Sequence, residues 1–269
     1  MTGLPEKERN AMNQQKRRVA LVTGGRRGIG LAAAEGLAAD GFDVAITGTR
    51  ADEVSKAAVD KLTAYGGAAF YVAGNVGDLD DHDRVLDAVE TALGPVDLLV
   101  ANAGIAPPQR LDLLETTPAN FDAVLSVNLR GTFFFAQNIA KRMLAAKISR
   151  AARALIFITS CSSEMVSLIR VEYCISKAAL SMAVSGFAVR LANEGISVFE
   201  IRPGIIRTDL TAGVAAKYDA LIEGGLVPAK RWGETTDIAA AVRALAQGNL
   251  AFATGSVLNL DGALSISRL

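Results

Sequence analysis

Two residues that could together transfer a proton lie four positions apart in the stretch VEYCISKAAL, residues 171–180. Residues at this spacing share one face of a helix, so Tyr173 and Lys177 would be close neighbours there. A phenol titrates near ~10, and an adjacent ammonium lowers that pKa by stabilising the phenolate. Tyr173 is therefore a candidate general acid or base, with Lys177 adjusting its pKa. The same pair also occurs on ordinary helices, so the rest of the chain must decide.

Two more polar residues are candidates for the same site. Ser160 follows the apolar run ALIFIT, residues 154–159, where a strand would end. Its hydroxyl could donate a hydrogen bond to a substrate carbonyl and to the alkoxide formed from it. Asn128 interrupts an otherwise apolar helical stretch, FDAVLSVNLRGTFFF, although asparagine is a mediocre helix former. Its side chain is either satisfied locally or held there for function.

A glycine-rich turn, TGGRRGIG at residues 23–30, lies between the first apolar run and the first helical stretch. Gly24, Gly28 and Gly30 have the spacing G-x-x-x-G-x-G, which differs from the commoner dinucleotide pattern G-x-G-x-x-G. A turn of this kind lets backbone approach a pyrophosphate, and the following helix N-terminus offers N–H groups to it. Its place on the first strand of an α/β chain favours a nucleotide over a purely structural turn.

The residues at the end of the second apolar run indicate which nucleotide cofactor the site would bind. Binders of unphosphorylated NAD usually place an acid there, against the ribose hydroxyls. This chain has Gly48 and Thr49 at that point, followed by Arg50, and Arg27 lies within the glycine turn. A guanidinium suits a 2′-phosphate, so we expect NADP(H) to be preferred over NAD(H), although Arg50 could be only a solvated loop charge.

The elements that must position these residues alternate along the chain. Short apolar runs predict strands, and amphipathic Ala-rich stretches predict helices between them. This alternation predicts an α/β, single-domain Rossmann fold: a doubly wound, seven-stranded parallel sheet with helices on both faces. The predicted strands are 18–23, 43–48, 68–73, 97–101, 154–159, 197–201 and 256–260, and the predicted helices are 28–39, 52–65, 79–92, 119–145, 172–193 and 235–247.

Two segments depart from this rhythm. Residues 1–17 are polar and charged with little periodicity, so we expect a mobile N-terminal tail before a catalytic domain at 18–269. Residues 209–232 contain several glycines and a proline and could cover a substrate. No linker or internal repeat marks a second domain.

Composition narrows the classes of function. The chain of 269 residues has 28 basic and 28 acidic side chains, so no global field favours nucleic acid or an anionic membrane. No apolar run approaches the length of a membrane span, and two cysteines, Cys161 and Cys174, predict small apolar fillers in a reducing cytoplasm. With one histidine, a zinc site is not expected; His82, in the acidic run DLDDHDR, is predicted to be solvated at a helix start.

Seven motifs in order make the chain resemble the short-chain dehydrogenase/reductase family from Arg18 onward. They are TGGRRGIG, ANAG (101–104), VNLRG (127–131), TS (159–160), Tyr173-x-x-x-Lys177, RPGIIRTD (202–209) and TGSVLNLDG (254–262). Two positions depart from the usual pattern. Ala101 precedes Asn102 where many members have a second asparagine, and Asn75-Val76 replaces Asp-Val, although Asn can still accept a hydrogen bond from an adenine amine.

The resemblance implies site residues and roles. Tyr173 would be the proton donor in ketone reduction, Lys177 would also bind the nicotinamide ribose, and Ser160 would bind the carbonyl. Asn128 would hold a water next to Lys177 for proton relay. The cofactor would contact Gly24, Arg26, Arg27, Gly28, Ile29, Gly30, Thr49, Arg50, Asn75, Val76, Asn102, Ala103, Gly104, Tyr173, Lys177, Pro203, Gly204, Ile206 and Thr208.

Within the family the chain most resembles the 3-oxoacyl-[acyl-carrier-protein] reductases of fatty acid synthesis. The resemblance implies an NADPH-dependent reduction of 3-oxoacyl thioesters, a homotetramer built on the two long helices, and a carrier protein as a candidate partner. Glu194 departs from the basic residue usual before the helix-ending glycine, while Lys141, Arg142, Lys147, Arg150 and Arg153 form a basic cluster that could dock a partner or simply be solvated. A sugar, polyol or other secondary-alcohol dehydrogenase, and a non-catalytic NADP(H)-binding sensor or scaffold, are the alternatives.

Overall fold

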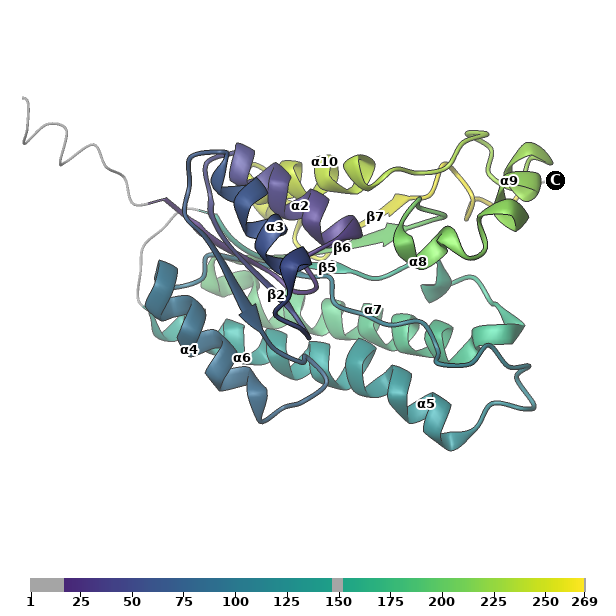
Figure 1. Cartoon of the computed structure of the whole chain (residues 1–269), viewed down its shortest axis with the longest axis horizontal. Helices are drawn as coiled ribbons and strands as arrows, with labels where there is room; N and C mark the ends of the chain where they lie inside the picture. Colours follow the sequence, from purple (N-terminus) through teal and green to yellow (C-terminus); the bar gives the residue numbers. More distant parts are fainter. Residues whose placement is uncertain (1–16, 147–151, 269) are drawn as a thin grey trace, which may run out of the picture.

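The computed structural model describes residues 17–146 and 152–268, and Figure 1 shows a sheet between two layers of helices. In this described part, seven strands form one sheet in the order β3-β2-β1-β4-β5-β6-β7, and every neighbouring pair is parallel. The predicted doubly wound parallel sheet is therefore confirmed. The strands are β1 (Val19–Val22), β2 (Asp43–Gly48), β3 (Ala69–Ala73), β4 (Leu98–Ala101), β5 (Arg153–Ile158), β6 (Ile196–Pro203) and β7 (Val257–Leu260).

The central strands are apolar because both of their faces are covered. In β1, Val19 and Leu21 belong to the core on one face of the sheet. Ala20 and Val22, which point the other way, belong to the core on the opposite face. Each side chain of this four-residue strand is fully buried, so no polar alternation could appear in its sequence.

Helices cover both faces of the sheet (Figure 1). Helices α2, α3 and α10 contribute to one core, and α4, α6 and α7 contribute to the other. Their bounds agree with the predicted ranges to within two residues, apart from the long helix described below. They are α2 (Gly28–Ala39), α3 (Glu53–Thr63), α4 (Asp81–Leu93), α5 (Pro118–Leu125), α6 (Thr132–Ala145), α7 (Val171–Leu191) and α10 (Thr235–Ala246).

The single helix predicted for 119–145 is interrupted. A π-helical turn, η1 (Ser126–Gly131), joins α5 to α6 and carries Asn128. Gly131 at its end lies so close to the neighbouring loop that an added Cβ would meet the Val76 carbonyl oxygen at 2.1 Å. π-Helical turns are rare and occur mostly at functional sites, and no side-chain period in the sequence distinguishes them from an α-helix.

Helix α7 differs from the expectation that no apolar run approaches the length of a membrane span. In the described residues, the helical stretch Leu168–Glu194 is long and apolar enough, by length and composition, to cross a membrane. A core helix passes the same test, and α7 packs on the sheet through Leu180, Val184 and Ala188. Only 39% of this window is buried, so its apolar composition combines the face packed on the sheet with an exposed apolar face.

The segment 209–232 forms two short helices beyond the C-terminal ends of the strands, α8 (Asp209–Ala212) and α9 (Ala215–Glu223). A small core of Ile222, Val227 and Trp232 lies beneath them. The Trp232 indole donates a hydrogen bond to the Asp219 carboxylate at 2.7 Å. This separate core holds the segment against the sheet without making it part of the sheet.

The prediction for His82 is wrong. Its ring is 2% exposed, its Nε2 atom lies 2.8 Å from the Val76 carbonyl oxygen, and its edge meets the Phe135 ring at 5.0 Å between centres. Of its acidic neighbours, Asp83 is exposed and Asp81 accepts the Asn75 N–H, because side chains one position apart on a helix do not share a face. The N-terminal tail predicted for 1–17 falls almost wholly outside the described residues.

Candidate active site

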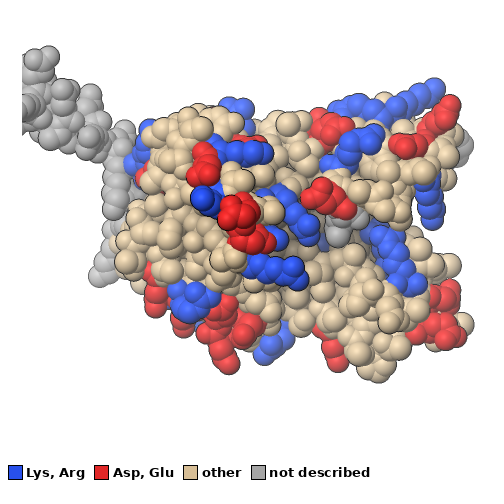
Figure 2. All heavy atoms as spheres, viewed as in Figure 1, with Lys and Arg blue, Asp and Glu red and all other residues tan. Residues whose placement is uncertain are grey.

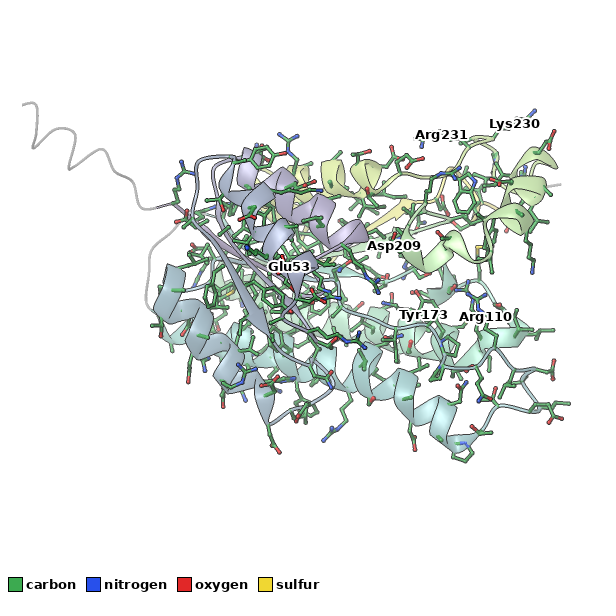
Figure 3. All side chains as sticks on the ribbon, viewed as in Figure 1. Glu53, Arg110, Tyr173, Asp209, Lys230 and Arg231 are labelled. Atoms are coloured by element: carbon green, nitrogen blue, oxygen red, sulfur yellow. The ribbon has the colours of Figure 1, made fainter. Side chains whose placement is uncertain are left out.

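A cavity of about 720 Å³ opens at the C-terminal ends of the strands. It begins at the glycine turn after β1, passes the ends of β2, β3 and β4, and reaches the ends of β5 and β6. Ligands bind at this edge of open α/β sheets, where the strand order reverses between β1 and β4. Figure 2 shows Lys and Arg side chains interspersed with Asp and Glu side chains near the centre of this face, and Figure 3 labels Asp209 and Tyr173 on opposite sides of it.

All but one of the predicted cofactor residues line this cavity. The lining residues are Gly24, Arg26, Arg27, Gly28, Ile29, Gly30, Thr49, Asn75, Val76, Asn102, Ala103, Gly104, Tyr173, Lys177, Pro203, Gly204, Ile206 and Thr208. Arg50 is the exception: its side chain is exposed, and its backbone carbonyl oxygen accepts hydrogen bonds from Arg26 and Ser55. A contact between the Arg50 side chain and a cofactor thus has no support in the cavity lining.

The glycine turn is built to bring backbone close to a ligand. Gly24 and Gly28 have φ values of +65° and +57°, which glycine adopts without strain. A Cβ on Gly30 would lie 2.4 Å from the Gly24 carbonyl oxygen. Asn102 fixes the turn to β4, because its amide donates to the carbonyl oxygens of Thr23 and Gly24 at 2.9 and 3.3 Å. Absent side chains and a fixed backbone fit the pyrophosphate of a dinucleotide.

The side chains near the end of β2 carry charge of both signs. The Arg26 guanidinium binds the Asp52 carboxylate at 2.8 Å, and Asp52 in turn caps α3 through the Ser55 N–H. The hydrogen bond from Arg26 lowers the pKa of the Asp52 carboxyl. The hydrogen bonds from Ser55 to Asp52 lower it further. Arg27 is freer: its side chain is 63% exposed, and the Asp209 carboxylate is 4.0 Å away.

Asn75, at the adenine end of the predicted site, already uses part of its hydrogen-bonding capacity. Its side-chain oxygen accepts the Gly77 N–H at 3.0 Å, and its backbone N–H donates to Asp81 at 2.9 Å. An amide oxygen has two lone pairs, so a second hydrogen bond from an adenine amine remains available.

Ser160, Tyr173 and Lys177 meet at the opposite end of the cavity. The Lys177 ammonium lies 5.7 Å from the centre of the Tyr173 ring and donates a hydrogen bond to the Ile158 carbonyl oxygen at 3.1 Å. The Ser160 hydroxyl accepts the Ser162 N–H at 3.0 Å, and its own proton has only a long contact, 4.0 Å, to the Cys161 sulfur, so it can turn to a ligand. The three side chains thus surround one end of a shared pocket, as their spacing predicts.

Burial controls the acidity of this group. Burial raises the pKa of the Tyr173 phenol, while the Arg170 guanidinium and the Ser160 hydroxyl lower it in part. Burial lowers the pKa of Lys177 to about 8, and the Glu200 carboxylate opposes that decrease. Lys177 therefore keeps its positive charge near neutral pH and loses it in mildly alkaline solution.

Asn128 is fully buried and lies behind the cavity wall. Its side-chain oxygen accepts the Ile105 N–H at 2.8 Å, and its amide donates to the Ile105 carbonyl oxygen at 3.0 Å. The amide also lies 3.3 Å from the Ser176 hydroxyl, which connects η1 to α7. These bonds satisfy the side chain locally and fix the Gly104–Ile105 backbone, so any relay role for Asn128 remains a prediction.

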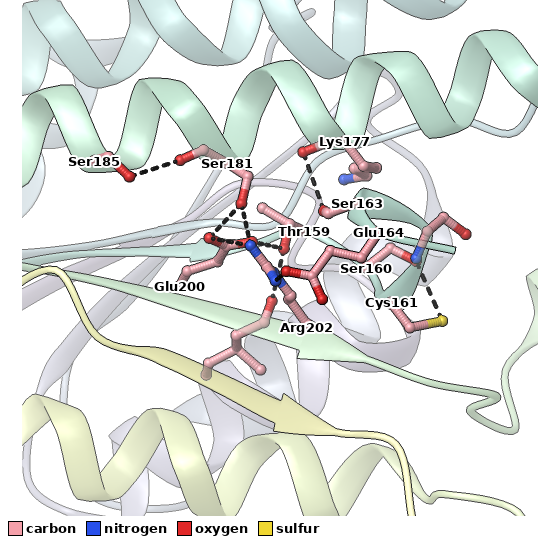
Figure 4. Close-up of polar contacts among 12 residues, drawn as sticks. Thr159, Ser160, Cys161, Ser163, Glu164, Lys177, Ser181, Ser185, Glu200 and Arg202 are labelled. Atoms are coloured by element: carbon pink, nitrogen blue, oxygen red, sulfur yellow. Dashed lines mark hydrogen bonds and ion pairs between the residues drawn. The ribbon is translucent and has the colours of Figure 1, made fainter. Parts of the chain in front are cut away.

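A buried carboxylate behind Ser160 and Lys177 was missed by the sequence analysis. Glu200 on β6 is 1% exposed and accepts hydrogen bonds from Thr159 at 2.6 Å, Ser181 at 2.6 Å and Arg202 at 2.7 Å (Figure 4). Thr159 and Arg202 directly adjoin Ser160 and Pro203, and Ser181 lies one helical turn after Lys177, so Glu200 joins the three segments that carry the site. The only available signal was a charged pair inside an apolar strand, EIRP at 200–203.

Arg170 and Cys161 are among the lining residues that were not predicted. Arg170 lies three positions before Tyr173, with its guanidinium 5.0 Å from the centre of the phenol ring. Cys161 is half-buried and lines the cavity, whereas Cys174 is buried, as expected of a small apolar filler. The reason is the turn η2 (Cys161–Ser163), which directs the residue after Ser160 along the wall.

Two members of the basic cluster, which was expected either to dock a partner or to be solvated, are engaged within the chain. Arg142 pairs with Asp83, Asp87 and Glu90 on α4. Arg153 donates to the backbone carbonyl oxygens of Met143 and Glu194. Lys147 and Arg150 lie outside the described residues.

Comparisons with known proteins agree with this geometry. A family sequence model described as Enoyl-(Acyl carrier protein) reductase matches residues 24–265. The chain is 33% identical to a 3-oxoacyl-[acyl-carrier-protein] reductase of Synechocystis over 91% of this chain and 96% of that one. A crystal structure of a 3-oxoacyl-[acyl-carrier protein] reductase from Brucella melitensis in complex with NAD is 52% identical, covers 95% of this chain and 100% of its own, and superposes with a TM-score of 0.92.

A relative with a different printed activity is also similar. The structure of a gluconate 5-dehydrogenase from Burkholderia cenocepacia in complex with NADP and tartrate is 31% identical. It covers 93% of this chain and 96% of its own, with a TM-score of 0.84.

Proposed function

Because the chain belongs to the short-chain dehydrogenase/reductase family, and is an NAD(P)-dependent oxidoreductase of that family, we propose that it reduces the ketone of 3-oxoacyl thioesters. The observation that carries the proposal is the meeting of Ser160, Tyr173 and Lys177 at the end of a cavity that begins at a dinucleotide turn. The high similarity to two 3-oxoacyl-[acyl-carrier-protein] reductases supports the choice of thioester.

The cavity fits a dinucleotide cofactor. The Gly24–Gly30 turn would hold the pyrophosphate, and Lys177 would hold the ribose next to the nicotinamide. When bound, the nicotinamide supplies the hydride that reduces the carbonyl carbon.

The chain's own residues manage the oxygen of the substrate. Ser160 donates a hydrogen bond to the carbonyl oxygen and to the alkoxide that develops from it. Tyr173 transfers its phenolic proton to that oxygen, and the Lys177 ammonium stabilises the phenolate left behind. In the reverse direction the Tyr173 phenolate removes the proton from the alcohol.

We further propose that NADP(H) is preferred over NAD(H). Gly48 and Thr49 at the end of β2 offer no carboxylate to the ribose hydroxyls, and the nearby Asp52 carboxylate is held by Arg26. Arg27 lines the cavity with a largely exposed guanidinium that suits a 2′-phosphate. The ratio of kcat/KM for NADPH to that for NADH tests this preference, and Arg27→Gln should lower the ratio about tenfold. A ratio below one in the unmodified protein would contradict it.

A sugar or polyol dehydrogenase is the second candidate, because the similar gluconate 5-dehydrogenase is named for a sugar acid. The loop before α7 favours an acyl chain, since Met165 and Val166 line the cavity. A panel of an acetoacetyl thioester, gluconate and simple polyols, each with both cofactors, separates the two candidates.

The proposed mechanism is tested by Tyr173→Phe, which removes the proton but keeps the ring. We expect at least a 10³-fold loss of kcat with the acetoacetyl thioester, because proton transfer to the alkoxide is lost. Cofactor affinity, measured by fluorescence titration of NADPH, should change little. Unchanged turnover in this variant would refute the assignment of Tyr173.

We also propose a homotetramer in the cytoplasm. Helix α7 exposes Ile175, Met182 and Val189 at spacings that place them on one face. Such a row of exposed apolar side chains is suited to a contact between copies of the chain. Light scattering of the purified protein tests the tetramer, and a charged residue at Met182 should shift the protein to smaller species.

A further inference from the structure

His82 is a buried histidine that forms a hydrogen bond to the loop after β3, at the adenine end of the cavity. Its Nε2 atom lies 2.8 Å from the Val76 carbonyl oxygen. A carbonyl oxygen can only accept, so Nε2 carries a proton and donates it. The other ring nitrogen, Nδ1, is buried and has no hydrogen-bond partner in the described part of the chain. An apolar side chain would fill this space without an unpartnered nitrogen, so the bond to Val76 is what distinguishes histidine here.

The Val76 carbonyl oxygen is enclosed, which leaves little room for water to replace this bond. Val76 is 8% exposed. On another side of the oxygen, Gly131 of η1 lies so close that an added Cβ would meet it at 2.1 Å. The His82 ring is in turn packed against the edge of the Phe135 ring on α6. The imidazole is therefore a fixed donor to a carbonyl oxygen that is held between α4 and η1.

The rest of the loop is fixed by three more hydrogen bonds. The Asn75 N–H donates to Asp81 at 2.9 Å, and the Asn75 carbonyl oxygen accepts the Asp78 N–H at 2.9 Å. The Asn75 side-chain oxygen accepts the Gly77 N–H at 3.0 Å. Because the peptide bonds are trans, the Val76 N–H points away from the Asn75 carbonyl oxygen. Among the described residues, this N–H donates to no protein acceptor.

The two free positions of the loop match one edge of adenine. Val76 and Asn75 both line the cavity, so the Val76 N–H and the second lone pair of the Asn75 side-chain oxygen are available to a ligand. On adenine, N1 accepts a hydrogen bond and the neighbouring N6 amine donates one. Hypoxanthine reverses both, because its N1 donates and its O6 accepts. A rigid loop with one donor and one acceptor therefore suits adenine and opposes hypoxanthine.

We propose that His82 is a positioning residue for recognition of the adenine base of the cofactor. The ring does not line the cavity, so it acts through Val76. Its bond to the Val76 carbonyl oxygen fixes the backbone that carries the Val76 N–H and keeps that donor directed at the base. This inference rests on the proposed placement of the dinucleotide and is independent of which carbonyl compound is reduced.

The test is a fluorescence titration with NADPH and with reduced nicotinamide hypoxanthine dinucleotide phosphate, which differs only in the base. In the unmodified protein we expect the Kd of the hypoxanthine analogue to exceed that of NADPH at least tenfold. His82→Phe keeps a buried aromatic ring but removes the donor, and it should lower this ratio of Kd values about tenfold, the effect of one hydrogen bond. His82→Gln places an amide N–H near the position of Nε2 and should retain most of the ratio.

A control in the opposite core separates positioning from stability. Phe42 is 4% exposed and packs on the other face of the sheet, just before β2. Phe42→Leu should lower the free energy of unfolding and leave the ratio of Kd values unchanged. The kinetics give a second separation. In His82→Phe the KM for NADPH should rise about tenfold while kcat changes less than twofold, because the residues around the nicotinamide are untouched.

A spectroscopic readout on the unmodified protein needs no variant and no turnover. His82 is the only histidine in the chain, so its imidazole resonances are assigned without ambiguity. We expect the Nε2–H resonance to shift when NADPH binds and to shift less with the hypoxanthine analogue. Equal shifts with the two cofactors overturn the proposal, also in the case that His82→Phe does not fold.

The outcomes separate this proposal from the proposed function. Base-selective binding that is lost in His82→Phe supports the role of His82 even if no thioester is reduced, in which case the reductase function fails alone. Reduction of the thioester with equal Kd values for the two cofactors overturns the proposal and leaves the reductase function standing. The same ratio in His82→Phe as in the unmodified protein also overturns it.

Discussion

Replacing Glu200 with glutamine should move the alkaline limit of activity to lower pH. Burial lowers the pKa of Lys177 from 10.5 to about 8, and the Glu200 carboxylate is the charge that opposes this decrease. Glutamine keeps the shape of the side chain but removes the charge. The pKa of Lys177 should therefore fall below 8, and the ammonium that stabilises the Tyr173 phenolate should be lost at lower pH.

The magnitude follows from the surroundings of Glu200. A partly buried attraction between carboxylate and ammonium is worth about 1–2 kcal/mol, which corresponds to roughly one pH unit in the pKa of Lys177. Stability should also fall, because the carboxylate accepts from Thr159, Ser181 and Arg202. Removing one partner of a buried ion pair costs about 3–5 kcal/mol. Glutamine retains one accepting oxygen and Arg202 retains Glu164, so we expect about 2 kcal/mol.

The assay is the pH profile of kcat/KM for the ketone between pH 6 and 10, with urea unfolding at pH 7. The matched control is Glu164→Gln, which removes an exposed carboxylate from the same arginine. We expect the control to leave the alkaline limb in place. An unchanged limb in Glu200→Gln, or a shift to higher pH, would refute the electrostatic link between Glu200 and Lys177.

Three further changes have defined outcomes. Gly30→Ala should weaken NADPH binding at least tenfold in a fluorescence titration, because its Cβ would meet the Gly24 carbonyl oxygen at 2.4 Å. The control Gly213→Ala meets nothing within 4 Å and should bind NADPH normally; equal affinities of the two variants would contradict the role of the turn. The free energy of unfolding of the unmodified protein, relative to that of Lys177→Met, should rise by up to ~3 kcal/mol from pH 8 to 10.5. In this range Lys177 is protonated in the unfolded chain and deprotonated in the folded chain. A difference in urea unfolding that does not change with pH would refute the lowered pKa. His82→Ala should lower the free energy of unfolding by about 2–3 kcal/mol in the same urea assay, because the ring is buried against Phe135 and hydrogen-bonded to the Val76 carbonyl oxygen. A loss below about 0.5 kcal/mol would show that the ring contributes little.

Strand and helix positions were predictable because both faces of the sheet are covered. Fully buried strands such as Val19–Val22 and Leu98–Ala101 are continuous apolar runs between helical stretches, and this pattern can be recognised from each segment alone. The interruption of the long helix at Asn128 could not be predicted from its own segment. It depends on the close approach of Gly131 to the Val76 carbonyl, a contact between residues far apart in the chain.

By itself, the sequence determined the alternating α/β order, the glycine turn and the Tyr173–Lys177 pair, because each depends on residues that are neighbours in the chain. The tertiary structure alone decided which charges act on that pair. It buries Glu200 behind Lys177 and places an unpaired Arg170 over the Tyr173 ring, while it engages Arg26 with Asp52 and leaves Arg50 outside the cavity. Electrostatic effects depend on distance and burial, and a linear sequence specifies neither until the chain has folded.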